Sequence, residues 1–307
     1  MFHNSFFKPF GYKLESPFIF NPSRFEVSGI TRGVWSGGNN GGTVNIMEYV
    51  TIQTTGNATD FGDMNVATEI QAGVSSDTRG VNMGGATVAD STSDTCEYIT
   101  ILTTGNGTDF GNLTVGRNNV AGMSNLTRGC CAGGDFTTDR NEIDYITIAS
   151  TGNATDFGDL TVARRATYGL GDSTRGLSAG GAISLNVIDY ITIASTGNAT
   201  DFGDLTVARR SGTTVADDTR GCFCGGATVN TIDYVTILTT GNATDFGDRT
   251  VSVQQCSGVH DATRGVMAGG ITTNVIDYIT IQTTGNATDF GDLSGTRTGM
   301  ASTGTWG

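Results

Sequence analysis

The feature that most constrains this chain is a unit of 44 to 49 residues that occurs six times. Each unit contains the triplet Thr-Arg-Gly, with its arginine at Arg32, Arg79, Arg128, Arg175, Arg220 and Arg264. A Gly pair begins five residues after each of these arginines, and an acidic residue followed by Tyr comes next. Twelve residues after each Tyr is the Phe of an Asp-Phe-Gly triplet. Repeats of this length are single supersecondary units that bury a core only by stacking on their neighbours.

Each unit divides into four short strands by its turn signals and its alternation of side chains. In the copy that ends at Phe246, we predict strands over 210–215, 220–225, 232–238 and 244–249. Both faces of the third strand carry apolar residues, as expected for sheets packed on both sides. The chain has 46 Gly and shows no apolar spacing of helical period, so we expect essentially no helix. Six units of four strands predict a β-propeller with six blades.

The Gly-Gly pair after the second strand, the Tyr of the third and the arginine before the next unit resemble kelch repeats. The last segment, 294–303, resembles a first strand, whereas the chain enters the first unit near Ile30 with a second strand. Pairing these two ends would leave no exposed sheet edge. The expected fold is therefore all-β, a six-bladed kelch-like β-propeller at 26–307 closed by its N- and C-terminal strands. An extended non-repeat N-terminal arm, 1–25, precedes it.

Charge and hydropathy exclude several classes of partner. The formal net charge is −13, and the two Lys, Lys8 and Lys13, lie in the arm. Nucleic acid attracts clustered cations, so we expect no nucleic-acid partner. No apolar run approaches the ~18 residues of a membrane-spanning helix, and the start does not resemble a signal peptide. We therefore expect no membrane insertion and no signal-dependent export.

The six Cys need an interpretation because Cys clusters can also form disulfides or bind metal. Four of them, Cys130, Cys131, Cys222 and Cys224, stand where other units have Val, Leu, Met, Ala, Ser, Asn, Trp or Phe. Such exchange is typical of small core residues, so buried free thiols are favoured over disulfides and metal ligands.

The block Gly-Asn-Ala-Thr-Asp-Phe-Gly-Asp, as at 56–63, has three interpretations. Its Asn begins an N-glycosylation sequon, and its carboxylates could contribute to a calcium site. We favour the third, a hairpin between the third and fourth strands in which Gly and Asn adopt positive φ.

The six Thr-Arg-Gly arginines are expected to pair with carboxylates such as the Asp or Glu before Tyr, because a partly buried guanidinium needs a partner. The alternative is a ring of binding sites around the channel. No His lies within a repeated motif, and the carboxylates recur six times, whereas an active site usually breaks symmetry. We therefore expect a protein that is not an enzyme, with no cofactor and no bound metal.

The variable parts of the units are the connections between the second and third strands. They hold nine, eleven, nine, seven, six and six residues in chain order. The long ones, 39–47, 86–96 and 135–143, belong to three adjacent blades. Loops on a rigid scaffold can vary in binding specificity, although neutral drift is the alternative. The residues we expect to contact a partner are Asn39, Asn40, Asp90, Asp94, Asp135, Phe136 and Arg140.

The arm is a different kind of segment, since 1–25 contains all three Pro and seven of the fifteen Phe. Aromatic side chains at this density usually mark an interface, so we expect docking on a neighbouring protein, with packing on the propeller as the alternative. The expected docking residues are Phe2, Phe6, Phe7, Phe10, Phe18 and Phe20.

The near-verbatim repeat Asp-Tyr-Ile-Thr-Ile, followed by Thr-Gly-Asn-Ala-Thr-Asp-Phe-Gly-Asp-Leu-Thr, resembles kelch-like proteins of tailed bacteriophages, especially those of marine cyanobacteria. This resemblance implies a virion protein, tail- or capsid-associated and assembled in the host cytoplasm, whose arm binds other virion proteins. A receptor- or glycan-binding module at a tail fibre or tail tip, in contact with the host surface, is the first alternative. A cellular kelch-type adaptor is the second.

Overall fold

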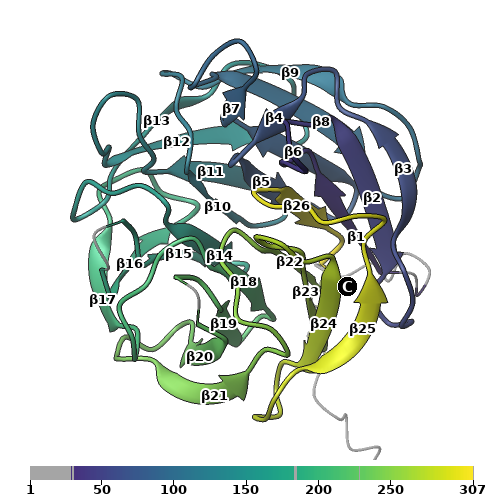
Figure 1. Ribbon diagram of the computed structural model, residues 1–307. Coiled ribbons are helices and arrows are strands. Elements are labelled where there is room, and N and C mark those ends of the chain that lie inside the picture. Colours follow the sequence, from purple (N-terminus) through teal and green to yellow (C-terminus); the bar gives the residue numbers. More distant parts are fainter. Residues whose placement is uncertain (1–28, 30, 183–184, 228, 307) are drawn as a thin grey trace, which may run out of the picture.

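The computed structural model describes residues 29, 31–182, 185–227 and 229–306. These residues form six four-stranded antiparallel sheets arranged around a central axis, and no helix occurs among them (Figure 1). The predicted all-β propeller with six blades is confirmed. The arm falls outside the described residues.

Every blade has the same order of strands from the axis outwards, and blades 1 to 6 follow the chain around the ring. The innermost strands are β26 (Ala301–Gly304), β5 (Ala72–Ser75), β10 (Ala121–Ser124), β14 (Tyr168–Gly171), β18 (Thr213–Ala216) and β22 (Ser257–His260). The second strands are β1 (Arg32–Ser36), β6 (Arg79–Met83), β11 (Arg128–Ala132), β15 (Arg175–Ala179), β19 (Arg220–Cys224) and β23 (Arg264–Ala268).

The third strands begin before the acidic residue and Tyr of each unit, and the outermost strands contain the Asp-Phe-Gly triplets. The third strands are β2 (Ile46–Thr51), β8 (Thr95–Thr100), β12 (Glu142–Thr147), β16 (Val187–Thr192), β20 (Thr231–Thr236) and β24 (Val275–Thr280). The outermost strands are β3 (Thr59–Asp63), β9 (Thr108–Asn112), β13 (Thr155–Asp159), β17 (Thr200–Asp204), β21 (Thr244–Asp248) and β25 (Thr288–Asp292).

Blade 1 is assembled from both ends of the repeat region. Its innermost strand, β26, pairs antiparallel with β1, so that Trp35 lies opposite Ser302. Outside the blades, β4 (Thr68–Glu69) pairs with β7 (Ala86–Thr87).

The predicted strand boundaries in blade 5 differ from the observed ones by up to three residues, and the largest difference has a local reason. The first strand of blade 5 begins at Thr213 rather than at 210, because Ser211 has a left-handed backbone with φ of 53°. A residue in that conformation cannot continue a β-ladder.

The core consists of apolar layers between neighbouring blades. The Phe of each Asp-Phe-Gly triplet is buried, with 2–3% of its surface exposed, and contacts the Tyr of its own blade edge-on. In blade 5 the rings of Tyr234 and Phe246 are 6.1 Å apart at 78°. All six Cys are buried free thiols, as predicted. Burial raises the pKa of Cys130 and of Cys222 to about 12, so both stay protonated and behave as small apolar side chains.

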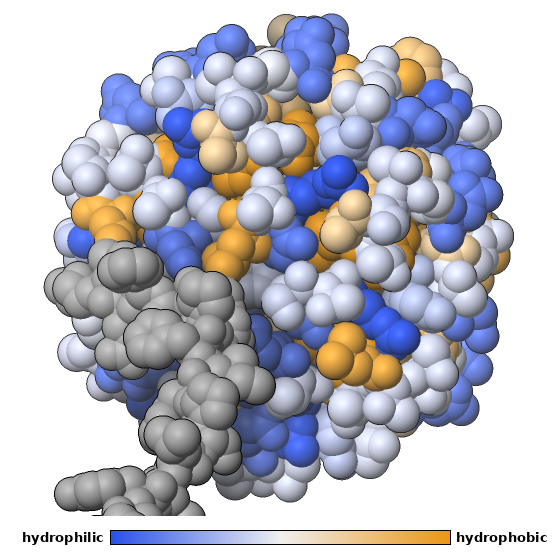
Figure 2. Space-filling model, turned by 180° about the vertical axis from the view of Figure 1, so that it is seen from behind, coloured by the Kyte–Doolittle hydropathy of each residue, from blue (hydrophilic) through white to orange (hydrophobic). Residues whose placement is uncertain are grey.

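Strands of alternating direction place the connections on two faces. The loop face carries the loops between second and third strands and the crossovers between blades. The turn face carries the first-to-second-strand turns and the third-to-fourth-strand hairpins. Figure 2, a view from behind Figure 1, shows apolar groups in small separate patches and hydrophilic groups along the circumference. Most of the large apolar side chains that are exposed lie on the loop face: Val66, Val88, Phe136, Val162, Val207 and Ile271.

Candidate functional site

The hairpin between the third and fourth strands, which contains the Gly-Asn sequence of each unit, forms hydrogen bonds with the outermost strand of the preceding blade. We call this contact the clasp. In blade 2, the backbone N–H groups of Gly105 and Gly107 donate to the carbonyls of Phe61 and Asp63 at 2.8 Å. The carboxamide oxygen of Asn106 accepts from the N–H of Asp63 at 3.1 Å. These bonds cover the outer edge of β3, which would otherwise expose unpaired backbone groups.

The same clasp occurs at all six interfaces. The corresponding Asn Oδ1 to N–H pairs, at 3.0 to 3.2 Å, are Asn106–Asp63, Asn153–Asn112, Asn198–Asp159, Asn242–Asp204, Asn286–Asp248 and Asn57–Asp292. The predicted hairpin is present, but the role assigned to Asn is wrong. The backbone φ of this Asn is not positive, and its side chain accepts a hydrogen bond from the adjacent blade.

The Gly of Asp-Phe-Gly is required by this contact. Gly158 has φ of 143°, and a Cβ placed on it would lie 2.6 Å from the carbonyl of Gly197. Any side chain here would push the two blades apart.

The Thr-Arg-Gly arginines do not pair with the acid before Tyr, and that prediction is wrong. Each guanidinium instead stacks on the Tyr ring of its own blade, with the carbon of Arg220 4.3 Å from the ring centre of Tyr234. Its Nη1 donates to a carbonyl of the next blade, which for Arg220 is that of Ile281 at 3.0 Å. Stacking and a carbonyl acceptor therefore take the place of a carboxylate.

A second set of arginines, in the crossovers, pairs with those acids. In blade 4, Arg164 Nη2 lies 3.2 Å from Asp189 Oδ2, and both side chains are fully buried. Asp189 also accepts from the N–H and the hydroxyl of Thr161. Burial lowers the pKa of Arg164 while the charge of Asp189 opposes this change. The five pairs are Arg117–Asp144, Arg164–Asp189, Arg209–Asp233, Arg249–Asp277 and Arg297–Glu48.

Sequence reasoning missed these arginines although a signal was present. Four of them recur four residues after a Leu that follows the outermost strand, as Arg164 follows Leu160. In blade 6 the two positions are exchanged. Arg249 occupies the Leu position and Val253 the Arg position, yet Arg249 Nη2 still reaches Asp277 Oδ1 at 2.9 Å.

A closed cycle of backbone hydrogen bonds surrounds the axis on the loop face. Each crossover contributes the residue that lies two positions before its innermost strand. The backbone N–H of this residue donates to the backbone carbonyl of the equivalent residue in the preceding crossover, at 2.7 to 2.9 Å. Its members all have φ of 52° to 66°: Ile70, Asn119, Ala166, Ser211, Gln255 and Gly299. We call this cycle the mouth ring. Five of its members are not Gly, and a left-handed backbone is energetically unfavourable for such residues. The structure around the ring therefore offsets this conformational cost.

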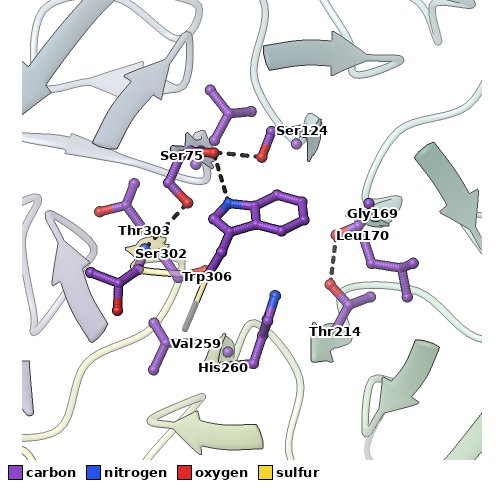
Figure 3. Close-up of a pocket in the computed structure, with 17 residues that line it drawn as sticks. Ser75, Ser124, Gly169, Leu170, Thr214, Val259, His260, Ser302, Thr303 and Trp306 are labelled. Atoms are coloured by element: carbon purple, nitrogen blue, oxygen red, sulfur yellow. Dashed lines mark hydrogen bonds between the residues drawn. The ribbon is translucent and has the colours of Figure 1, made fainter. Parts of the chain in front are cut away.

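On the turn face, Trp306 lies at the axis (Figure 3). Its indole N–H donates to the carbonyl of Ser75 at 2.9 Å, and the ring of His260 meets it edge-on. The cavity around it holds about 60 Å³ and is lined largely by Gly, Ser and Thr of the innermost strands. Small-molecule sites usually measure ~300–1,000 Å³, so this cavity accommodates water rather than a substrate.

The predicted partner-contact residues lie on the loops of blades 1 to 3. Asn39 forms bridges to Thr43 and Thr298 and is half-buried, whereas Asn40 is exposed. Asp90 and Asp94 are exposed in the longest loop.

In blade 3, Asp135 bridges to Asn118, and Arg140 pairs with Glu142 at 3.4 Å. Phe136 exposes 48% of its surface. The predicted docking residues of the arm lie outside the described residues.

Over the part of the chain that the structure describes, no group of three or more His, Cys, Asp or Glu could hold a metal ion. Within the same residues, no helix could cross a membrane. Comparison with protein-family models and with curated proteins gives no match to this chain.

Proposed function

We propose that this protein is a non-enzymatic structural and interaction component of a tailed-phage virion. In this proposal the kelch-like propeller is a rigid ring, the arm docks it on a neighbouring virion protein, and the long loops of blades 1 to 3 contact a further partner. The resemblance of the repeats to phage kelch-like proteins supports the virion, and the Phe-rich arm supports the docking.

One observation carries the non-enzymatic part of the proposal. Three kinds of polar group that recur in every blade are engaged between or within blades: the sequon Asn in the clasp, the motif Arg on Tyr and a neighbouring carbonyl, and the acid before Tyr in five cases on a buried Arg. Residues that bind or transform a ligand must be free to contact it. Exposed side chains that differ from blade to blade lie in the loops of the loop face, and binding residues usually occur in such loops.

The arm can be tested in the full chain by replacing Phe6, Phe7 and Phe10 together with Ser. The substituted protein should give the circular dichroism of the parent but be lost from purified particles. Val207→Ser is the control, because it removes exposed apolar surface of the loop face outside the three long loops, and it should be incorporated normally. Normal incorporation of the arm variant would contradict docking through the arm.

Phe136 also favours a second candidate, a receptor- or glycan-binding module. Its ring is exposed beside the polar bridge of Asp135 and Asn118, and an exposed aromatic ring next to hydrogen-bonding groups can stack on a sugar. In this case Phe136→Ser particles would assemble but adsorb poorly to host cells. Unchanged adsorption would remove this candidate.

A further inference from the structure

The interface between blades 1 and 2 lacks the buried ion pair found at the other five. The acid of blade 2, Glu97, is buried, with 4% of its surface exposed. The crossover position that holds Arg117 at the next interface holds Thr68 here, four residues after Met64. The acid therefore remains in place without its cation.

Among the residues that the structure describes, two buried oxygens at this interface have no hydrogen-bond partner. Glu97 Oε1 accepts from the N–H of Asn65 at 3.1 Å, whereas Oε2 has no hydrogen bond. Asn82 lies directly opposite Glu97 in the β6–β8 ladder, is 3% exposed, and its Oδ1 also has no partner. Residues opposite each other in a ladder project to the same side of the sheet. Two unpaired acceptors thus lie on the side of the sheet where other interfaces place a guanidinium, which is costly.

The surrounding charges do not compensate. The crossover contributes the neutral side chains of Asn65 and Thr68 and the acid Glu69, which accepts from Thr43. On β6 the charged residue is Arg79, which stacks on Tyr98 and donates to the carbonyl of Ile148. Across the β8–β9 ladder, Asp109 lies opposite Glu97. Burial raises the pKa of Glu97, the polar groups of Asn65 and Val66 near the carboxylate oppose this rise, and the charge of Asp109 adds to it.

We propose that the interface between the β3–β5 crossover and β8 is a pH-dependent joint, which is tight when Glu97 carries a proton and loosens when Glu97 is ionised. A proton on Oε2 converts one of the two unpaired acceptors into a donor and removes the charge that burial disfavours. Ionisation leaves an uncompensated charge inside the ring. The five buried ion pairs hold the remaining interfaces, so loosening is confined to this one.

The direction of the pH dependence follows from linkage. A carboxyl whose folded pKa lies above its unfolded value of 4.5 contributes stability that is fully present below that value. This contribution is lost as the pH rises through the folded pKa.

The direct test is titration of the full chain with ¹³C-labelled Glu carboxyl groups, of which the sequence has six. The Glu97 signal, assigned through bonds to its own backbone in the parent protein, should titrate at higher pH in the native state than in the denatured state. Titration at the same pH in both states would overturn the proposal. This measurement uses the parent protein, so it decides the question even if a variant fails to fold.

Glu97→Gln also tests the consequence, because its amide is uncharged and carries a donor that the carboxylate lacks. The variant should unfold at higher denaturant concentration than the parent at about pH 7.5, and this advantage should shrink towards about pH 4. Amide exchange in β8 should slow at neutral pH. The matched control Asp144→Asn, which strips Arg117 of its partner, should lower stability instead. Equal or lower stability of Glu97→Gln at neutral pH would contradict the proposal.

Discussion

The side-chain oxygen of Asn57 accepts a hydrogen bond of 3.1 Å from the backbone N–H of Asp292, although 235 residues separate the two along the chain. This bond joins blade 1 to blade 6. The interface between blades 6 and 1 therefore has the same outer-edge hydrogen bond as the other five interfaces. The pairing of β26 with β1 closes the ring at the inner strands of blade 1.

Replacing Asn57 by Ala should destabilise the ring modestly. The N–H of Asp292 loses its acceptor but lies near solvent, so the cost should be about 0.5–1.5 kcal/mol, the net value of one hydrogen bond. Asn57→Asp keeps an acceptor oxygen and should recover most of the loss. Denaturant unfolding measures both variants. An equal loss in Asn57→Asp would show that the carboxamide N–H₂ group, rather than its oxygen, supports the clasp.

Breaking the ion pair of blade 4 should cost far more. Asp189→Asn leaves the guanidinium of Arg164 buried without a counter-charge and should lower the free energy of unfolding by about 3–5 kcal/mol. Arg164→Met should cost a similar amount, and the double variant should cost less than the sum. The adjacent residue is the control. Arg165, with 45% of its side chain exposed, pairs with Asp139, and Arg165→Ala should change stability by about 0–1 kcal/mol.

Gly158→Ala should destabilise the protein more than Gly152→Ala. Both glycines have similar backbone angles, with φ of 143° and 153°. A Cβ at Gly158 would meet the carbonyl of Gly197, whereas one at Gly152 would meet nothing within 4 Å. The difference should be about 1–3 kcal/mol, the usual cost of overpacking. Similar unfolding midpoints for the two variants would mean that the blades can separate slightly without cost.

Alkaline pH should weaken the fold through the buried thiols. The pKa of Cys130 and of Cys222 rises from 9.0 to about 12 on folding because of burial. Their contribution is fully present below pH 9.0 and is lost as the pH rises through the folded value. The variant with both Cys130→Val and Cys222→Val, which copies Val34 and Val266 of other blades, should lose less stability as the pH rises from 9.0 towards about 12. An identical alkaline decline would assign the effect to other groups.

The number of blades and the order of their strands could be predicted because each depends on short-range signals that occur six times. The period, the Gly pairs and the Asp-Phe-Gly triplets are local features, and so is the Val-like context of Cys130. The partner of a charged side chain is not a local feature. Arg220 and Asp233 lie in the same unit and were expected to pair, yet Arg220 contacts Tyr234 and the next blade, and Asp233 pairs with Arg209 from the crossover.

Other parts of the interfaces had no distinctive sequence pattern. The mouth ring is formed by backbone groups, and its members, such as Ile70, Asn119 and Gly299, share no side-chain chemistry. Arg249 and Val253 have exchanged positions, so the recurring spacing between Leu and Arg does not reveal Arg249. Its ion pair with Asp277 is nevertheless retained. The isolation of Glu97 becomes visible only when all six interfaces are compared in space.

The mouth ring has a consequence for recognition. Its six bonds form a closed hoop, so one crossover cannot move outwards unless a bond breaks or the others follow. Outside the joint between the β3–β5 crossover and β8, the crossovers and the loops beside them are therefore held in a fixed arrangement before any partner arrives. A partner that contacts several blades meets a preorganised surface, and little conformational entropy is lost when it binds. Loop sequences can then change from blade to blade while the geometry that presents them stays the same.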